Sequence, residues 1–228
     1  MISITKLNSS PTEKQISEFE NMFLKTPERK YTDLTITESP FKGFLKSSAI
    51  QESSPLKDLH PDLSFAINKL YRAAGLSITS QPKKENGSKG AKYVAHRLGI
   101  NYQTVAFRVG KITPTRVGNF VTLWKRPNGK NKPIDLSDDV SFVVVDVSGV
   151  SGQKGQYIFD QDVLVKQKIF SVSSENQKGK MAFRVFPPWV NPKPSAIKTQ
   201  EWQLHYFFPI TSSEIPYSEI RRLFKAKV

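Results

Sequence analysis

Residues 104–126, TVAFRVGKITPTRVGNFVTLWKR, carry the pattern around which the rest of the chain is organised. Apolar residues alternate with smaller or polar ones up to Val109, which is typical of a half-buried strand. Pro114 and Gly118 interrupt this alternation, and it returns from Phe120 onward. The pattern therefore predicts two strands joined by a turn.

The second of these strands has two different faces, because successive side chains of a strand point in opposite directions. One face is expected to hold Phe120, Thr122, Trp124 and Arg126, and the other Val121, Leu123 and Lys125. One side of the hairpin then buries apolar residues, while its ends and turn present the cations Arg108, Lys111, Arg116, Lys125 and Arg126. We expect a basic platform on a rigid support.

The positive charge of the chain is concentrated in its C-terminal part. The formal net charge is +14, yet residues 1–85 hold 12 basic and 10 acidic side chains, against 22 and 10 in residues 86–228. Between Asn86 and Ile134 there are ten Lys or Arg and no Asp or Glu. A field of one sign across a folded surface attracts polyanions, so nucleic acid is the first partner to consider.

The sequence lacks the residues or patterns that several functions require. The chain has no cysteine, which excludes disulfides, thiolate nucleophiles and cysteine metal sites. The three histidines, His60, His96 and His205, do not have metal-ligand spacing, so no metal site is predicted from them. Neither a signal peptide nor a run that could span a bilayer is indicated, and we expect a soluble, cytoplasmic protein.

Other elements are predicted from start signals, stop signals and periodicity. Helices are expected over residues 11–24, 61–74, 195–208 and 217–227, the third capped by Ser195. Strands are expected over residues 91–103, 140–147, 155–159 and 181–186. Residues 81–90 are expected to form a polar connection, and residues 160–168 either a helical turn or a strand edge.

Four separated stretches resemble the MepB family, bacterial proteins named for an operon with a multidrug efflux pump. They are KITPTRVGNFVTLWKR at 111–126, GQYIFDQDVLV at 155–165, GKMAFRVFPPWV at 179–190 and KTQEWQLHYF at 198–207. Their order and spacing agree with the family, and the likeness extends roughly over residues 61–225. We therefore expect a MepB-like domain at 61–228 that follows an N-terminal helix and irregular arm at 1–60.

The resemblance implies a mixed α+β fold, namely a restriction-endonuclease-like core with a central mixed sheet flanked by helices. It also suggests DNA binding. Nucleases with this core place an acid on one strand and Glu-x-Lys or Asp-x-Lys on the next, so that carboxylates hold Mg²⁺ beside a lysine. The central hairpin here has no carboxylate, and Asp160-Gln-Asp162 lacks the lysine two positions later. In the family a Glu is also expected shortly before the first strand. The only candidate here is Glu85, which does not lie at the expected position.

The acids that remain for catalysis are Asp146, Asp160 and Asp162, with Lys111 or Lys166 as the cation beside the attacking water. The simpler interpretation, which we favour, is that Asp160 and Asp162 cap a helical turn and that Asp146 faces solvent. No cofactor is then expected, and Mg²⁺ would be needed only if the protein is a nuclease.

These patterns together favour a non-catalytic or weakly catalytic protein that binds nucleic acid, with double-stranded DNA preferred. Cations beside aromatic rings suit phosphates and bases. The expected contacts are Arg108, Lys111, Arg116, Trp124, Lys125, Arg126, Arg184, Lys198 and Trp202. Two alternatives stay open: a metal-dependent nuclease, and an accessory protein that binds a protein partner or small anionic ligand through Pro187, Pro188 and Trp202.

Overall fold

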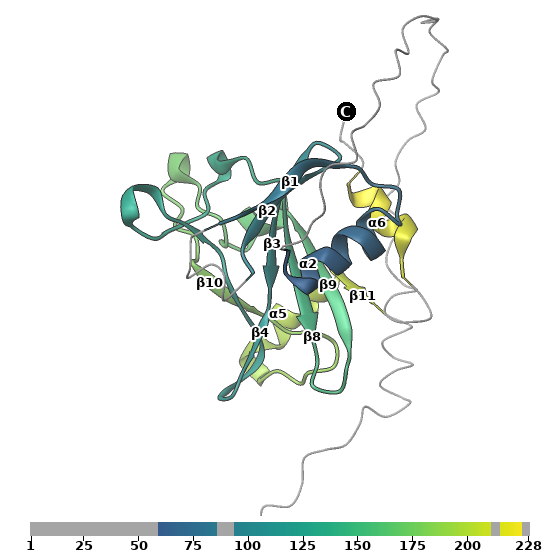
Figure 1. Ribbon diagram of the computed structural model, residues 1–228. Coiled ribbons are helices and arrows are strands. Elements are labelled where there is room, and N and C mark those ends of the chain that lie inside the picture. The colour runs from purple at the N-terminus through teal and green to yellow at the C-terminus, as the bar shows by residue number, and fades with distance from the viewer. Residues whose placement is uncertain (1–58, 86–93, 211–214, 225–228) are drawn as a thin grey trace, which may run out of the picture. The chain divides into compact units, whose positions relative to one another are not determined.

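A central β-sheet organises the chain in the computed structural model (Figure 1). The structure describes residues 59–85, 94–210 and 215–224, all of which belong to the compact unit Leu56–Val228. The helix predicted at 11–24 and almost all of the irregular arm lie outside the described residues.

Six strands of the described chain form the main sheet in the order β1-β2-β3-β8-β9-β11. They are β1 (Ile78–Lys84), β2 (His96–Ile100), β3 (Gln103–Val109), β8 (Phe142–Ser148), β9 (Lys154–Asp160) and β11 (Phe207–Pro209). Strands β3 and β8 are parallel, and the other neighbours are antiparallel. The prediction of a mixed α+β fold with a central mixed sheet is confirmed.

Residues 110–141, between the parallel strands β3 and β8, form four further strands, and one strand from later in the chain pairs with them. Strands β4 (Lys111–Thr113), β5 (Arg116–Thr122) and β10 (Ala182–Val185) make a second sheet in the order β10-β5-β4. Strands β6 (Trp124–Lys125) and β7 (Lys132–Pro133) pair as a separate ribbon.

The predicted pairing within residues 104–126 is wrong in one respect. The hairpin is made by β4 and β5, and β3 does not pair with either strand. Both edges of β3 are already occupied, by β2 and by β8. The chain turns away at Gly110, whose amide donates to the carbonyl of Asp146, and a new sheet begins.

The helices are short and pack against the sheets. They are α2 (Pro61–Phe65), the π-helix η1 (Ala66–Tyr71), α4 (Gln161–Lys166), α5 (Pro194–Leu204) and α6 (Tyr217–Leu223). Single 3₁₀ turns are η2 (Pro127–Gly129), η3 (Leu136–Asp138) and η4 (Ser173–Glu175). The helix predicted from Pro61 is confirmed, and its residues Leu63, Ile67 and Leu70 are fully buried.

Two local predictions are corrected. Residues 81–84 belong to β1 and not to a connection, because an edge strand needs only backbone pairing and tolerates proline and lysine. Ser195 does not cap α5, which begins at Pro194 after Lys193. A proline has the helical φ already and serves as a first helical residue.

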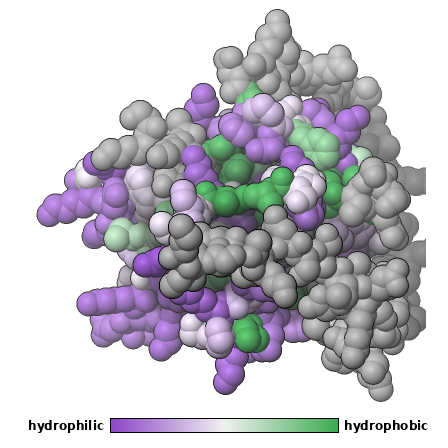
Figure 2. Space-filling model, turned by 90° about the horizontal axis from the view of Figure 1, so that it is seen from below, coloured by the Kyte–Doolittle hydropathy of each residue, from purple (hydrophilic) through white to green (hydrophobic). Residues whose placement is uncertain are grey.

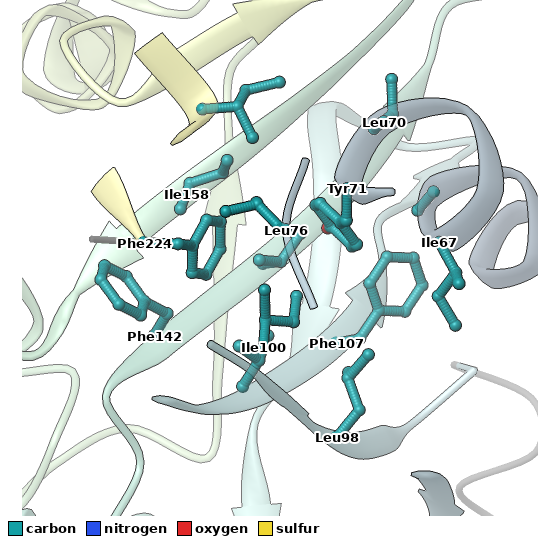
Figure 3. Packing of buried hydrophobic residues seen from close by; sticks show 14 of the residues in the cluster. Ile67, Leu70, Tyr71, Leu76, Leu98, Ile100, Phe107, Phe142, Ile158 and Phe224 are labelled. Carbon is teal, nitrogen blue, oxygen red and sulfur yellow. The ribbon is translucent and has the colours of Figure 1, made fainter. Parts of the chain in front are cut away.

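The main sheet is covered on both faces. On one face, helices α2, η1 and α6 pack against Phe107, Val144 and Ile158 (Figure 3). On the other face, apolar residues of β10, β5 and α4 join Val143, Val145 and Phe159 in a second core cluster. The strand predicted at 140–147 is confirmed as β8, and it is buried on both faces.

Candidate nucleic-acid interface

The β10-β5-β4 sheet places two cations on either side of one aromatic ring. Lys111 on β4 and Arg184 on β10 are both paired in register with Phe120 on β5. Side chains directly opposite one another lie on the same face of a sheet, so these three form a row across the strands. Figure 1 shows β4 and its turn at the bottom of the view, away from the main sheet.

Arg184 holds the hairpin in a defined shape. Its guanidinium donates to Thr113 Oγ1 at 2.8 Å and to the carbonyl oxygens of Gly118 at 3.1 Å and Arg116 at 3.4 Å. It also lies over the ring of Phe120, 5.5 Å from the centroid. Burial and the neighbouring Arg116 lower the pKa of Arg184, yet an arginine in a protein stays charged. Arg184 is therefore a positioning residue for the hairpin.

Gly118 brings the base of the hairpin against Phe186. Its φ is +83°, and a Cβ there would lie 2.7 Å from both Phe186 Cδ1 and the carbonyl oxygen of Val185. We expect Gly118→Ala to lower the free energy of unfolding by about 2 kcal/mol, from left-handed strain and overlap together. Gly152→Ala is the matched control, because Gly152 has φ +85° and nothing within 4 Å of its would-be Cβ. Chemical denaturation of both variants tests this; equal losses would contradict the steric contribution.

The β6–β7 ribbon presents a second set of cations. Arg126, Lys130 and Lys132 are exposed around its turn, where Asn128 and Gly129 have positive φ. The Arg126 side chain donates to the carbonyl of Gly129 at 2.9 Å. Lys125 is half-buried and forms a salt bridge with Asp138.

A buried carboxylate anchors the chain that leaves this ribbon. Asp135 accepts hydrogen bonds from the backbone amides and hydroxyls of Ser137 and Ser173. These bonds lower the pKa of Asp135 to about 2, because they favour the charged carboxylate. The ribbon is thus attached to the loop that contains η4, far along the sequence.

Arg108 is not part of the surface, and the prediction that the hairpin presents it is wrong. Its side chain is 1% exposed, and it donates to Glu85 Oε2 at 2.7 Å. It also donates to the carbonyl oxygens of Thr122, His96 and Phe107. Parity explains the burial: Val105 and Phe107 face the α2 side of the sheet, and Arg108 faces the opposite side, beneath β5.

Glu85 is the acid that joins these elements. It follows β1, and its amide donates to the carbonyl of Ala95, which directs the carboxylate to Arg108 and to Arg97 at 2.8 Å. Burial raises the pKa of Glu85, but the two guanidiniums outweigh burial, and the pKa lies below its ordinary value. Arg97 also donates to the carbonyl of Asp138, so the network extends to the β6–β7 ribbon.

Two predicted contacts lie on α5, apart from both the hairpin and the ribbon. Lys198 is exposed, and Trp202 is half-buried. The Trp202 ring packs against Phe159, with the centroids 5.5 Å apart, and against Tyr206. Gln203 connects this helix to β10, since its side chain bonds the amide of Phe186 and the carbonyl of Arg184. Trp124, on β6, is half-buried.

The acids considered for catalysis do not converge. Asp146 lies opposite Gln156, and Asp160 lies opposite Phe142 at the other end of β8; four residues of strand separate them, roughly 13 Å. Asp160 caps α4 by accepting from the amide of Val163, as favoured above, and Asp162 is exposed near Lys166 in the same short helix. In the described ranges, no three His, Cys, Asp or Glu side chains are grouped as metal ligands.

Asp146 is buried, and the prediction that it faces solvent is wrong. It is 1% exposed, and Gln156 donates to its Oδ2 at 3.0 Å, while Tyr71 donates in turn to Gln156. Within the described residues its Oδ1 has no hydrogen-bond partner. Burial raises the pKa of Asp146 to about 6, although the Gln156 hydrogen bond and the charge of Lys154 oppose the shift.

Several surface residues were not among the predicted contacts. Lys130 and Lys132 flank the turn of the ribbon, and Pro114, Ile112 and Val117 are exposed on the hairpin. The Pro-Asn-Gly sequence between cations was a usable signal for the first pair. Exposed aliphatic residues have no such signal, because their alternation is the same as that of a buried strand.

The comparisons with known proteins agree with one another. A family model described as MepB-like matches residues 87–209. The crystal structure of MepB is similar with 28% sequence identity and a TM-score of 0.55, over 66% of this chain and 96% of that chain. No curated protein matches. In the part of the chain that the structure describes, no helix has both the length and the apolar character needed to cross a membrane.

Proposed function

Because this chain belongs to the MepB-like family and exposes cations on two connected β-structures, we propose that it binds nucleic acid, with double-stranded DNA as the preferred form. The observation that carries the proposal is that the chain runs from the β4–β5 hairpin almost directly into the β6–β7 ribbon and that both carry cations. The half-buried Lys111 and the exposed Arg116 belong to the first, and the exposed Arg126, Lys130 and Lys132 to the second.

The chain between the two sets is long enough to span up to one turn of a duplex. Strand β5 continues into β6 with only Leu123 between them, so Arg116 and Arg126 are ten residues apart on nearly continuous extended chain. Extended chain advances about 3.3 Å per residue, which gives roughly 33 Å at most. One turn of B-DNA is about 34 Å long, and phosphates recur on the same side of the duplex at that interval.

The chemistry of the contacts fits binding to the backbone of the nucleic acid. Exposed Lys and Arg neutralise phosphates and release counterions, which gives affinity without sequence preference. Three acids near these strands are engaged elsewhere: Asp138 holds Lys125, Asp135 is bonded to two serines, and Glu85 holds two arginines. These three carboxylates already have partners, so they oppose phosphate binding less than free carboxylates would.

Salt dependence tests the proposal. We expect the triple variant Arg126→Gln, Lys130→Gln, Lys132→Gln to weaken duplex binding and to reduce the slope of log affinity against log salt by up to about 2.7, at about 0.9 per lost contact. Fluorescence anisotropy of a labelled duplex between low and moderate salt measures this slope.

The matched control removes the same charge from another surface. Lys69, Arg72 and Arg222 are exposed on or beside η1 and α6, which cover the opposite face of the main sheet. Their replacement by Gln is expected to change the slope of log affinity against log salt by less than about 0.9, the value for one contact. If duplex and single-stranded DNA both fail to bind, or if the control variant loses as much as the ribbon variant, the proposal is wrong.

A protein partner at the aromatic surface is the second candidate. Trp189 directly follows the Pro187–Pro188 pair, and Trp189 and Trp202 are both half-buried, so part of each side chain stays accessible. Their remaining area packs against Phe207 and Phe159. A pull-down that captures one partner with the wild type and loses it with Trp202→Ala would favour this function over DNA binding.

A further inference from the structure

The β4–β5 hairpin, residues 111–122, has two chemically different faces. Lys111, Thr113 and Arg116 lie on the side of Phe120 and Arg184. Ile112 is paired with Asn119 on the other side, and Val117 shares that side because it is two residues from Asn119. Ile112 is 55% exposed and Val117 44% exposed, so the apolar face continues beyond the edge of the core.

The tip of the hairpin is also apolar. Pro114 is exposed in the turn between the two strands, next to the exposed Arg116. Figure 2 shows the molecule from below, a face on which hydrophilic residues surround smaller apolar patches. Phosphate binding alone uses only the cations, and it leaves these aliphatic side chains in water without a function.

The hairpin is held rigid before any ligand arrives. Arg184 bonds it at three positions, Gly118 fixes its base against Phe186, and the proline restricts its turn. A register shift between Ile112 and Thr113 adds local twist. A preorganised element loses little conformational entropy on binding, which is what insertion into a narrow groove requires.

The type of apolar residue distinguishes two forms of nucleic acid. Proteins that hold single strands offer aromatic rings on which bases stack. The exposed residues here are aliphatic, and Phe120 is covered by the guanidinium of Arg184. Aliphatic and proline side chains at the end of a cationic β-ribbon are the wedges with which proteins open a base step of a duplex.

We propose that the β4–β5 hairpin enters a groove of duplex DNA, where Pro114, Ile112 and Val117 wedge against a base step and partly unstack it. Lys111 and Arg116 would contact the flanking phosphates. This inference rests on the proposed function, and it adds that the partner is double-helical and is deformed on binding. Flexible pyrimidine–purine steps are then preferred, since they cost the least to unstack.

The test uses a short duplex with 2-aminopurine in a TA step, whose fluorescence rises when the base unstacks. We expect saturating wild-type protein to raise the fluorescence at least about twofold. Ile112→Ser with Val117→Ser should abolish the rise, weaken binding by about tenfold or less, and leave the salt slope unchanged. Ile112→Ser alone should give an intermediate rise.

Val150→Ser is the matched control, because Val150 is 89% exposed at the β8–β9 turn; it should behave as the wild type. If the wild type binds the duplex with the expected salt slope but does not raise the fluorescence, the proposal that the hairpin unstacks a base step is wrong. The proposal that the protein binds DNA is then supported. A rise that survives in the double-serine variant, or tighter binding to the single strand, also overturns it. Absence of any binding would refute both proposals.

Discussion

Arg108→Met is expected to lower the free energy of unfolding by about 3–5 kcal/mol, which is the usual cost of removing one partner of a buried ion pair. The guanidinium holds Glu85 and three backbone carbonyls from β2, β3 and β5. Methionine fills a similar volume but donates no hydrogen bond. Arg97 keeps Glu85 partly neutralised, so we expect a folded but strongly destabilised variant.

Denaturant unfolding of the variant and of Arg116→Met measures this effect. Arg116 is exposed, and its replacement should change stability by about 0.5 kcal/mol or less. Similar losses in the two variants would show that Arg108 contributes no more than a surface arginine. The variant should also have a higher pKa at Glu85, because the charge of Arg108 lowers that pKa in the wild type.

Asp146→Asn is expected to raise the free energy of unfolding at pH 7.5 by up to about 3 kcal/mol, because one pKa unit corresponds to about 1.4 kcal/mol. The pKa of Asp146 is raised from 3.8 to about 6 by burial, so its ionisation is unfavourable in the folded protein. Asparagine retains an oxygen that can accept from Gln156 and removes the charge. Such gains are expected where a buried carboxylate is only partly satisfied.

The sign of the pH dependence follows from the two pKa values. Between about pH 4 and pH 6 the folded protein binds the Asp146 proton and the unfolded chain releases it, so stability falls as pH rises. Above pH 6 both forms are ionised and the full penalty applies. The advantage of the variant should therefore be large at pH 7.5, shrink between pH 6 and pH 4, and vanish below pH 4.

Thermal or denaturant unfolding at pH 4, 5, 6 and 7.5 tests this profile. Glu201→Gln is the control, since Glu201 is an exposed acid on α5 and its neutralisation should be nearly without effect at every pH. A variant that is less stable than the wild type at pH 7.5 would contradict the expectation. It would mean that the ionised carboxylate has a favourable partner.

Local sequence determined the elements that depend on neighbours along the chain. Helical spacing of apolar residues after Pro61 identified α2 and η1, and the apolar run at 140–147 identified β8, because periodicity and apolar composition are properties of a single segment. The proline pair at 187–188 marked the end of β10 in the same way. The net positive charge of the chain followed from residue counts alone.

Tertiary structure decided which strands pair and which ionisable groups are buried. Alternation in residues 104–126 is the same whether β3 pairs with β5 or, as found, with β2 and β8. Arg108 and Arg116 both lie in alternating segments, and only the structure shows that Arg108 is buried beneath β5 and bonded to Glu85, 23 residues earlier, while Arg116 is exposed. Asp146 is buried by Tyr71 and Gln156, which come from distant segments. Pairing and burial depend on contacts between segments far apart in the chain, and a one-dimensional pattern contains no information on which of those segments meet.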